Sequence, residues 1–557
     1  MKKWTVLAVI LVIIASMLLT ACGEPEETTT PTTQPTSAPT SAPTSAPTSA
    51  PTSAPTSAPT SAPTTAPTTA PTTTPVDEPQ YGGTLKIITC ENLPTYEALV
   101  KADGPVLSQV IACQWDSLIS YDAEGNLYPY LAESFDINED ATMMTFNLRH
   151  GVYFHDGTEL TSEAVKYHIE NFTFLRWLQR LDEITVETPD KYTAILHIEN
   201  PHPTFPYTLG AGLWAGIGSP TAYEKDTLEE RLAGGSGPFK FVDWVRDVHL
   251  KYERYDDYWQ EGRPYLDALE ILFYADRTTA MMAFEAGDAQ VFRDLTPREA
   301  ADLRDKGYNI NYSGGSYYLL VPDSFPGSPF ADPLVREAIE YAVDKEALTE
   351  SFGYGFMNPQ YQTAPVDRPD SYVPGLPERK YDPDKARELL SLAGYENGFD
   401  TALHCQTQDD RDLLATIQSY LTEVGIRAKI EPMEPARFHE VGREGWTNAI
   451  KFYHYGYDMD WRSCYKSFFG KEAGAHFEAM DKPVAMTDAI TEASQLTDKE
   501  RITELMQSVT QILYDQALAI PLWSEATMCA YDDTVHDIDI AAIDIFSWHP
   551  ADIWLSQ

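Results

Sequence analysis

Apolar residues recur at strand and helix spacings through the chain from about residue 80 onward. Alternation or short apolar runs typical of strands occupy three stretches: 84–88, 143–148 and 519–523. Helical spacing occupies four others: 106–119, 332–348, 382–393 and 501–513. Because strands and helices are mixed along the whole segment, the pattern predicts an α/β fold.

Two places in this pattern carry their own boundary signals. Asp382 and Pro383 stand at the start of one helix, as a capping carboxylate and a first-turn proline, and Gly394 stands at its end. Asp156 and Gly157 follow a strand-like stretch and predict a turn with a capping carboxylate rather than a catalytic motif. These signals predict local structure and indicate no catalytic or binding role.

A low-complexity segment precedes the patterned region. Residues 28–75 contain only Thr, Pro, Ser and Ala apart from Gln34, mostly as Thr-Ser-Ala-Pro repeats. No side chain in it is large enough to build a core, so the segment is expected to stay unfolded. Its regular prolines favour extended polyproline II, which would span up to about 150 Å. The segment is expected to be a tether, either a plain spacer or a stalk that carries O-glycans.

The first residues have the pattern of an export signal. Lys2 and Lys3 precede an apolar run from Trp4 to Leu19, and small residues lead up to Cys22. This arrangement resembles the lipobox of bacterial lipoproteins, in which the cysteine is lipidated and becomes the mature N-terminus. Two acyl chains on Cys22 would give stable membrane anchoring. The alternative is an uncleaved signal anchor, since the apolar run is nearly long enough to span a bilayer.

The balance of charge excludes some classes of partner. With 84 Asp and Glu against 40 Lys and Arg, the formal net charge is −44. Such a chain disfavours nucleic acid and anionic lipid surfaces as partners. The patterned segment is also longer than one hydrophobic core usually organises, so two or more lobes are expected.

Six cysteines are present, and lipidation of Cys22 would leave an odd number in an oxidising location. Cys405 and Cys464 could form a disulfide within one lobe. Alternatively, all the remaining cysteines could be small buried residues: Cys90, Cys113, Cys405, Cys464 and Cys529. No pair has CxxC spacing and no His/Cys cluster has zinc-ligand spacing, so neither a structural metal site nor a cofactor is expected.

Five blocks of sequence occur in a recognisable order. The first contains LAESF, TFNLRHGV and FHDG within 131–157, and the fourth contains DPLVREA and YAVDK within 332–345. The others lie at 235–259, 283–288 and 381–395. Together they resemble the bacterial extracellular solute-binding proteins of family 5, the receptors of dipeptide, oligopeptide and nickel ABC importers. The resemblance covers nearly all of 80–557.

The resemblance implies a two-lobe periplasmic-binding-protein-like fold of the class II or cluster C type, with an extra subdomain in the first lobe. The implied divisions are 1–21 for the signal peptide, 22–78 for the anchored tether, 79–320 for lobe I with the subdomain at about 126–232, 321–518 for lobe II, and 519–557 for a return to lobe I. The ligand would lie in a cleft between the lobes, beside two crossing segments near 312–320 and 519–524.

The candidate ligand site is a segment of the second lobe rich in aromatic residues and aspartate. In peptide-binding relatives, an aspartate in the corresponding stretch holds the peptide α-ammonium, with an aromatic residue just upstream. Asp458 matches that position, with Tyr455 as the aromatic residue, and Asp460 is the second choice. Tyr457 and Trp461 are adjoining candidates. A carboxylate in a closed cleft suits a cation because the charge-assisted bond strengthens as water is excluded, although both aspartates could instead cap a loop.

Further aromatic residues could stack on sugars or peptide side chains, or could equally be core residues. Trp214 and the pair Tyr317 and Tyr318 lie beside glycines, which let a ligand approach the backbone. Trp115 is a similar candidate. His454 could suggest a metal, but nickel-type relatives place a histidine after the corresponding loop, where this chain has none. No metal ligand is therefore expected.

The expected function is that of a substrate-binding lipoprotein that captures a di- or oligopeptide and delivers it to the subunits of an ABC permease, with no chemistry of its own. It is expected to be a monomer anchored on the outer face of the cell membrane, extracellular or periplasmic. Peptide binders usually continue into Asp-Pro or Glu-Pro where this chain has Trp-Arg-Ser at 461–463, so a β-linked oligosaccharide stays open as the ligand.

A tethered surface hydrolase is the alternative from another class. It would use Asp458 and Asp460 as a carboxylate pair. Glycosidase carboxyl groups stand about 5–9.5 Å apart, and residues two positions apart meet that spacing only in an irregular loop. No nucleophile motif such as GxSxG is present to support hydrolysis.

Overall fold

The computed structural model spans residues 1–557 and describes ten stretches: 78–90, 112–122, 126–171, 184–201, 203–210, 216–225, 227–456, 461–471, 476–538 and 548–556. The chain divides between Pro75 and Val76 into two units, and every described residue belongs to the second. The expected signal peptide, Cys22 and the tether lie outside the described residues. In the described part of the chain, no helix is long and apolar enough to cross a membrane.

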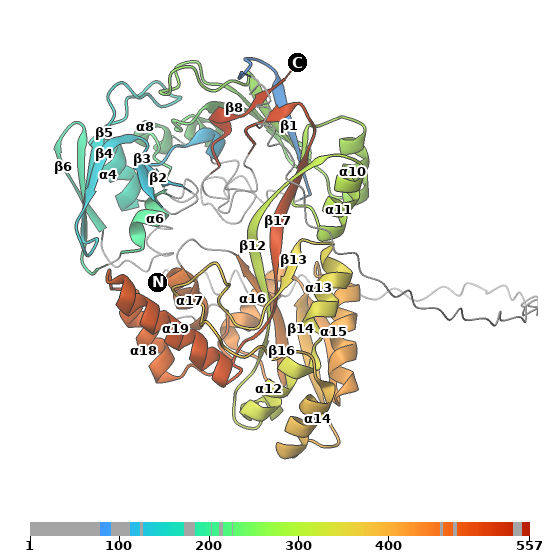
Figure 1. The fold of residues 1–557 in the computed structure, drawn as a ribbon. Helices are drawn as coiled ribbons and strands as arrows, with labels where there is room; N and C mark the ends of the chain where they lie inside the picture. The colour runs from blue at the N-terminus through green and yellow to red at the C-terminus, as the bar shows by residue number, and fades with distance from the viewer. Residues whose placement is uncertain are drawn as a thin grey trace, which may run out of the picture. The chain divides into compact units, whose positions relative to one another are not determined.

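Eleven strands of the described chain form one mixed sheet (Figure 1). Their spatial order is β15 (Ile426–Met433), β14 (Phe399–Gln406), β16 (Ala449–Gly456), β12 (Asn309–Pro322), β17 (Ile520–Tyr531), β11 (Val291–Arg293), β1 (Thr84–Thr89), β10 (Ala268–Phe273), β9 (His249–Arg254) and β8 (Phe239–Val245), with β13 (Met357–Pro359) paired to β17. β1 runs parallel to β10 and β11, and β14 runs parallel to β15 and β16. The predicted α/β class is confirmed.

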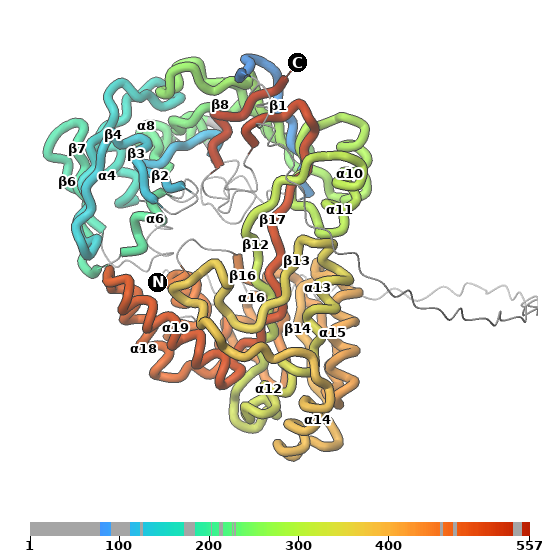
Figure 2. Tube along the Cα trace, viewed as in Figure 1, coloured from blue at the N-terminus to red at the C-terminus, as the bar shows by residue number. Residues whose placement is uncertain are grey.

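The two longest strands of the described chain, β12 and β17, form an antiparallel ribbon through the middle of this sheet. In Figures 1 and 2 the ribbon joins an upper group of elements, which includes β1, β8 and α10, to a lower group, which includes β14, α12 and α15. We call these groups lobe I and lobe II. The crossing segments implied by the resemblance, 312–320 and 519–524, overlap β12 and β17. The residue limits given above for each lobe remain a prediction.

In lobe I a hydrophobic core lies on each face of the sheet around β1, as in other sheets covered on both sides. In β1, Ile87 packs in one core with Leu269 and Val291, and Ile88 packs in another with Phe284 of α10. Two helices flank the second core: α10 (Arg277–Glu285) and α11 (Pro297–Asp305). The last described residues return to the first core through the paired strands β18 (Val535–His536) and β19 (Trp554–Leu555) and the short helix η2 (Pro550–Asp552).

A second, antiparallel sheet adjoins these strands. Its order is β4 (Ala132–Ile137), β5 (Met143–Leu148), β7 (Thr193–Ile198) and β6 (Ile184–Asp190). The remaining elements of this region are β2 (Ile119–Tyr121), β3 (Leu127–Pro129), α4 (Ser162–Asn171), α6 (Phe205–Gly210), α8 (Pro220–Tyr223) and α9 (Leu228–Leu232). The predicted turn is present: Gly157 has φ +81°, and Asp156 accepts hydrogen bonds from the Thr158 amide and the Ser219 hydroxyl.

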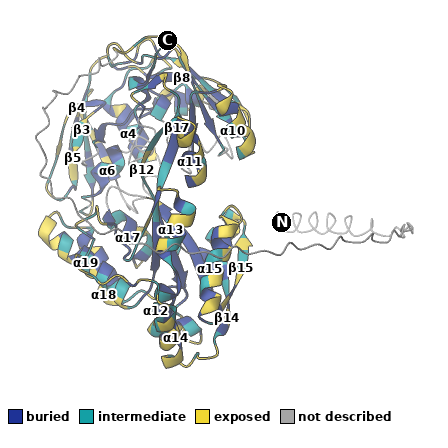
Figure 3. Cartoon of the chain, turned by 45° about the vertical axis from the view of Figure 1, so that its right-hand side comes forward, coloured by how far each residue is buried: buried dark blue, intermediate teal, exposed yellow. Residues whose placement is uncertain are grey.

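Lobe II covers both faces of β14 and β16 with amphipathic helices. One face carries α12 (Pro333–Ala342), α13 (Lys345–Gly353), α14 (Pro383–Leu392), α15 (Arg411–Glu423) and the short η1 (Pro329–Ala331). The other carries α16 (Pro435–Glu444), α17 (Trp461–Phe469), α18 (Val484–Ala493) and α19 (Lys499–Asp515). Figure 3 shows exposed residues on the outer sides of α14, α15 and α18 and buried residues toward the strands.

The predicted helix 332–348 is in fact two helices. Val343 adopts an extended conformation with φ −100° and ψ 121°, which ends α12. Asp344 then caps α13 by accepting a hydrogen bond from the Ala347 amide at 2.9 Å. The apolar spacing continued across the break because both helices bury residues in the same core. The predicted helix after Asp382 begins at Pro383 and ends before Gly394, as its boundary signals indicated.

No disulfide joins the cysteines of the described chain. A bridge between Cys405 and Cys464 is therefore not present. The reason is positional, since Cys405 of β14 is buried in the core beneath α15 and Cys464 of α17 is buried in the core on the other face of the sheet. The alternative expectation, that these residues are small buried side chains, fits Cys113, Cys405, Cys464 and Cys529; Cys90 is partly exposed.

A buried lysine lies in the core of lobe II. The Lys451 side chain on β16 is fully buried, and its Nζ donates to the Phe438 carbonyl at 3.1 Å. The ammonium lies 4.1 Å from the Phe438 ring centroid and 5.3 Å and 5.2 Å from those of Trp446 and Tyr453. Burial, together with the nearby Arg443, lowers the pKa of Lys451 to about 7. The cation–π contacts therefore offset only part of the free-energy cost of removing the ammonium from water.

We expect Lys451 to make the stability of the folded unit rise with pH. Between about pH 7 and its ordinary pKa of 10.5, the unfolded chain binds a proton that the folded chain does not. The free energy of unfolding should therefore rise across this window, relative to Lys451→Met, by at most about 1.4 kcal/mol per pH unit. Urea unfolding of both proteins at pH 7, 8.5 and 10 measures the difference, and parallel pH profiles would contradict the assignment.

Candidate ligand-binding cleft

Strand alternation gives the β12–β17 ribbon two different faces. Residues paired across an antiparallel ladder lie on the same face, and the register pairs Ser316 with Glu525 and Tyr318 with Trp523. The neighbouring strand β16 adds His454, paired with Tyr318, and Gly456, paired with Ser316. These side chains form one face of the ribbon. Residues between them, such as Tyr317 and Tyr455, belong to the other face.

The first face lines a cavity of about 790 Å³ that has walls in both lobes. Lobe I contributes Arg277, Arg293 and the segment 294–297, and lobe II contributes Phe352 and the segment 408–410. The volume falls within the range of small-molecule binding sites. A ligand in this cavity can therefore contact the ribbon and both lobes at once.

The position of the cavity follows from the direction of the strands. Asp294 follows β11, which is parallel to β1, and residues 408–410 follow β14, which is parallel to β15 and β16. The carboxyl ends of the parallel strands in both lobes thus border the same space. In open α/β sheets, ligands bind at this edge because the loops that follow the strands are free to carry polar groups there.

Aromatic rings form the floor of the cavity. The ring of Tyr318 stacks on Trp523 with centroids 5.0 Å apart and planes at 18°, and His454 lies 4.9 Å from Tyr318. Trp523 is buried, whereas Tyr318 and His454 are partly exposed. Burial lowers the pKa of His454 to about 4, so its imidazole is neutral at physiological pH. The floor is uncharged and presents ring faces.

The positive charges of the lobe I wall are already paired. Arg277 binds both carboxylate oxygens of Glu299, with its Nε 2.8 Å from Oε1. Arg293 Nη2 lies 2.8 Å from Asp294 Oδ1, and Asp294 Oδ2 accepts a hydrogen bond from the Thr89 hydroxyl at 2.8 Å. The Nε of Arg293 is buried and has no hydrogen-bond partner among the described residues. The arginines thus leave little free positive charge for an anionic ligand.

The acidic groups are less completely paired. Asp410 caps α15 by accepting from the amides of Asp412 and Leu413. Asp409 accepts one hydrogen bond, from the Gln406 amide at 2.7 Å, and burial raises its pKa to about 6. Burial also raises the pKa of Glu525 to about 7. The unmatched charge of the cavity is therefore negative above neutral pH.

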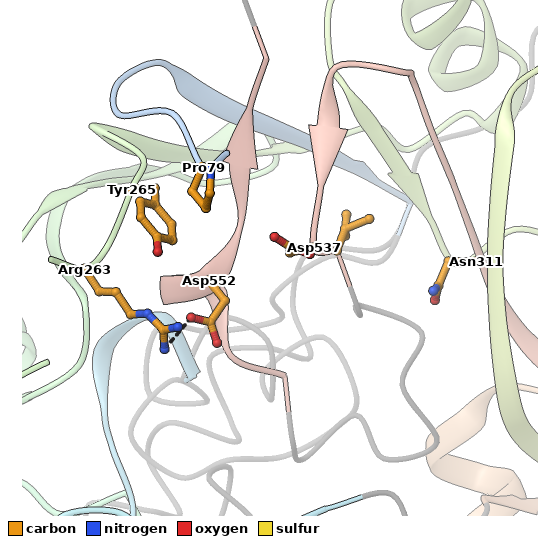
Figure 4. Close-up of a pocket in the computed structure, with 7 residues that line it drawn as sticks. Pro79, Arg263, Tyr265, Asn311, Asp537 and Asp552 are labelled. Carbon is orange, nitrogen blue, oxygen red and sulfur yellow. Dashed lines mark ion pairs between the residues drawn. The ribbon is translucent and has the colours of Figure 1, made fainter. Parts of the chain in front are cut away.

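A second cavity, of about 570 Å³, lies in lobe I (Figure 4). Arg263 and Asp552 line it and form an ion pair with each other. Asp537, also in its wall, accepts a hydrogen bond from the Trp554 indole at 2.8 Å. The Arg263–Asp552 pair attaches the returning C-terminal segment to lobe I, and the Asp537–Trp554 bond joins two parts of that segment.

A sequence profile of the group described as "Bacterial extracellular solute-binding proteins, family 5 Middle" matches residues 126–474, more than half of the chain. The chain belongs to family 5 of the bacterial extracellular solute-binding proteins. Proteins of this family are receptors, not enzymes, and they bind a ligand and deliver it to ABC permeases. This finding confirms the resemblance noted in the sequence and argues against the hydrolase alternative.

Individual members of family 5 resemble the chain over most of its length. The glutathione-binding protein GsiB of Escherichia coli (strain K12) is 28% identical over 468 residues, which are 80% of this chain and 90% of that protein. The structure of DppA from Helicobacter pylori in complex with the peptide STSA has a TM-score of 0.73 at 22% identity, over 86% of this chain and 99% of that one.

A nickel-type structure is equally similar in fold. NikA from Brucella suis, in complex with Fe(III)-EDTA, has a TM-score of 0.73 at 21% identity, over 84% of this chain and 99% of that one. These likenesses confirm the periplasmic-binding-protein type of fold. Among the described residues, no group of three or more His, Cys, Asp or Glu side chains is arranged to hold a metal ion.

The structure places three of the predicted site residues together, on the face of the ribbon away from the cavity. Tyr317 stacks on Tyr455 with centroids 6.0 Å apart, and Trp461 lies 5.2 Å from Tyr317. All three are buried, and the Tyr455 hydroxyl donates to the Thr363 carbonyl at 3.0 Å. Their contacts are those of the lobe II core. A role for them in ligand binding remains a prediction.

The other predicted site residues, Trp214, Tyr457, Asp458 and Asp460, lie outside the described residues. In the sequence, Asp458 and Asp460 follow Gly456, the last residue of β16, and Gly456 lines the cavity.

Asp409 and Glu525 were not among the sequence candidates. The alternation of side chains along β17 could have indicated that Glu525 and Trp523 share one face of the strand. Which face of β17 borders a cavity, however, depends on how both lobes pack around it.

Two glycines of this region should respond oppositely to substitution. A Cβ on Gly456 would meet nothing within 4 Å, whereas one on Gly315 of β12 would collide with the Glu525 carbonyl. We expect Gly456→Phe to keep the melting temperature and to abolish binding, because its ring projects into open space at the cavity. Gly315→Ala should lower the melting temperature by forcing the ribbon strands apart.

Calorimetry with pools of short peptides and β-linked oligosaccharides, together with thermal unfolding, tests both variants. Retained binding in a normally folded Gly456→Phe protein would show that the ligand lies elsewhere.

Proposed function

We propose that this protein is the substrate-binding lipoprotein of an ABC importer and that its ligand is a di- or oligopeptide held by its α-ammonium. The observation that supports the peptide most is the charge of the cavity. The arginines in its wall are paired with Glu299 and Asp294, whereas Asp409 and Glu525 are left with acceptor capacity. A cationic group on the ligand would complete these bonds, and an anionic ligand would not.

Asp458 is the proposed partner of the ammonium, with Asp460 as the second choice. Both follow directly in sequence from a residue that lines the cavity. Desolvation between lobes would strengthen such an ion pair, because the same charges interact more strongly once water is excluded. Two relatives support a peptide: GsiB is named as glutathione-binding, and the Helicobacter pylori DppA structure contains the peptide STSA.

A β-linked oligosaccharide is the second candidate. It is favoured by one observation, the partly exposed ring of Tyr318, which is held flat on the buried Trp523. A ring fixed in this way offers a stacking surface for a sugar without further loss of side-chain entropy. The unpaired carboxylates favour the peptide over this neutral ligand.

The ammonium assignment predicts the effect of Asp458→Asn. The substitution keeps the shape of the side chain and removes its charge, so peptide binding should weaken by about 1.5–3 kcal/mol, roughly ten- to a hundred-and-fifty-fold. N-acetylation of the peptide should cost the wild type much more than the variant, since each change removes one side of the same pair. Calorimetry with free and acetylated trialanine measures this double-mutant cycle.

The control for this cycle is Tyr318→Ala, measured with the same peptides and with cello-oligosaccharides. A peptide receptor should lose more peptide affinity through Asp458→Asn, and a sugar receptor should lose more affinity through Tyr318→Ala. Unchanged peptide affinity in Asp458→Asn would transfer the role to Asp460 or overturn the peptide assignment.

Anchoring through Cys22 completes the proposed function, with the protein held on the outer face of the membrane. We expect Cys22→Ala to release the protein into the medium or to leave an uncleaved precursor, because no thiol remains to carry the lipid. Ligand affinity should be unchanged. Metabolic labelling with a radioactive fatty acid measures the modification, and wild-type labelling of the variant would contradict the lipobox.

A further inference from the structure

Glu525 is the least satisfied acidic group in the described wall of the cavity. It lies on β17 between Ser316 of β12 and Met357 of β13, and both of these neighbours also line the cavity. Among the described residues no basic group forms an ion pair with its carboxylate, and its side-chain hydrogen-bonding neighbour is Trp523. The contact with Trp523 lowers the pKa of Glu525 less than burial raises it.

Other charged groups of the cavity have partners that Glu525 lacks. Arg277 and Arg293 are paired with Glu299 and Asp294, Asp410 caps α15, and Asp409 accepts a backbone amide. His454, on the same face as Glu525, is neutral at physiological pH. No described basic group is therefore left to neutralise Glu525 from within the protein.

We propose that Glu525 makes this receptor selective for peptides that carry a basic side chain, lysine or arginine, in addition to the α-ammonium. This inference rests on the proposed peptide function and adds a second cation site to the same cavity. A partly buried carboxylate without a cationic partner is unfavourable, and a basic side chain arriving with the ligand removes that penalty. A neutral side chain in its place would leave the carboxylate desolvated and unpaired.

The physical basis is a charge-assisted hydrogen bond at a largely desolvated position. Bonds of this kind are roughly twice as strong as neutral ones, and the loss of one partner leaves the other buried and unpaired. The penalty thus falls on every peptide that lacks the basic group. Selectivity has two sources. The carboxylate attracts a peptide with a basic side chain, and its unpaired charge disfavours a peptide without one.

Binding of the basic side chain should depend on pH. Burial raises the pKa of Glu525 to about 7, so the carboxylate is present above that pH and is lost as the pH falls toward 5.5. The other ionisable and charged residues that border the cavity are Arg277, Arg293, Asp294, Tyr318, Asp409, Asp410 and His454. Asp409, with a pKa of about 6, also becomes protonated in this range, so the Glu525 contribution must be isolated by substitution.

The test is calorimetry at pH 8 with trialanine, with tripeptides in which lysine replaces each alanine in turn, and with matched peptides that contain norleucine. We expect the wild type to bind one lysine peptide at least about tenfold more tightly than its norleucine counterpart. Glu525→Gln should reduce this preference to within about twofold. Asp409→Asn is the comparison variant, because Asp409 is the other carboxylate of the cavity with acceptor capacity and its amide oxygen can still accept the Gln406 amide; loss of the lysine preference there instead would assign the basic side chain to Asp409.

A stability measurement guards against misfolding. Below its ordinary pKa of 4.5 Glu525 is neutral in both states, and between 4.5 and about 7 only the unfolded chain loses the proton. Wild-type stability should therefore fall across this window relative to Glu525→Gln, and the variant should melt at a higher temperature at pH 8. A preference that persists in Glu525→Gln, or that is lost in Asp409→Asn instead, would overturn the role of Glu525.

The two proposals fail in different ways. Equal affinity of the wild type for lysine and norleucine peptides would overturn the role of Glu525 alone and leave the peptide receptor intact. Failure of the wild type to bind any of the tripeptides would overturn the peptide function, and this inference with it.

Discussion

The register of the β12–β17 ribbon is the constraint on which the cavity depends. It sets Ser316 opposite Glu525 and Tyr318 opposite Trp523, so that one face carries the cavity lining beside the core of α12 to α15, and the other packs in the core of α16 to α19. A shift by one residue would exchange the two faces. Gly315 protects this register, since any side chain there would collide with the backbone of β17. The ribbon is therefore both the connection between lobes and the floor of the site.

The pairing of charged side chains in the cavity walls then determines the charge of the ligand that the cavity can bind. Arg277 and Arg293 form ion pairs with neighbouring carboxylates within lobe I, and His454 is neutral because desolvation lowers its pKa to about 4. The acidity of the cavity is thus a local property rather than a reflection of the net charge of −44. Surface charges are screened by salt beyond about 10 Å, whereas groups around a desolvated cavity interact at close range.

Local signals allowed the strands, the capped helices and the turn at Asp156 to be predicted from the sequence, because each depends on residues a few positions apart. The break at Val343 was missed since the apolar spacing continued across it. For the cavity, the sequence named Tyr317 and Tyr318 of β12 together, and only Tyr318 lines it. That choice depends on which face of the ribbon borders the cavity between residues of both lobes, and the significance of Glu525 depends on charge pairing within both lobes.

Ligand specificity and lobe movement are linked by the way the cavity is built. Its walls belong to different lobes, with 294–297 on one side and 408–410 on the other. A ligand favours a closed arrangement only through contacts that are better in that arrangement than in an open one. Contacts with the ribbon alone would leave the balance unchanged. A peptide held at Asp458 and Glu525 would contact lobe II and the ribbon, so closure would depend on what the rest of the peptide contacts at residues 294–297 of lobe I.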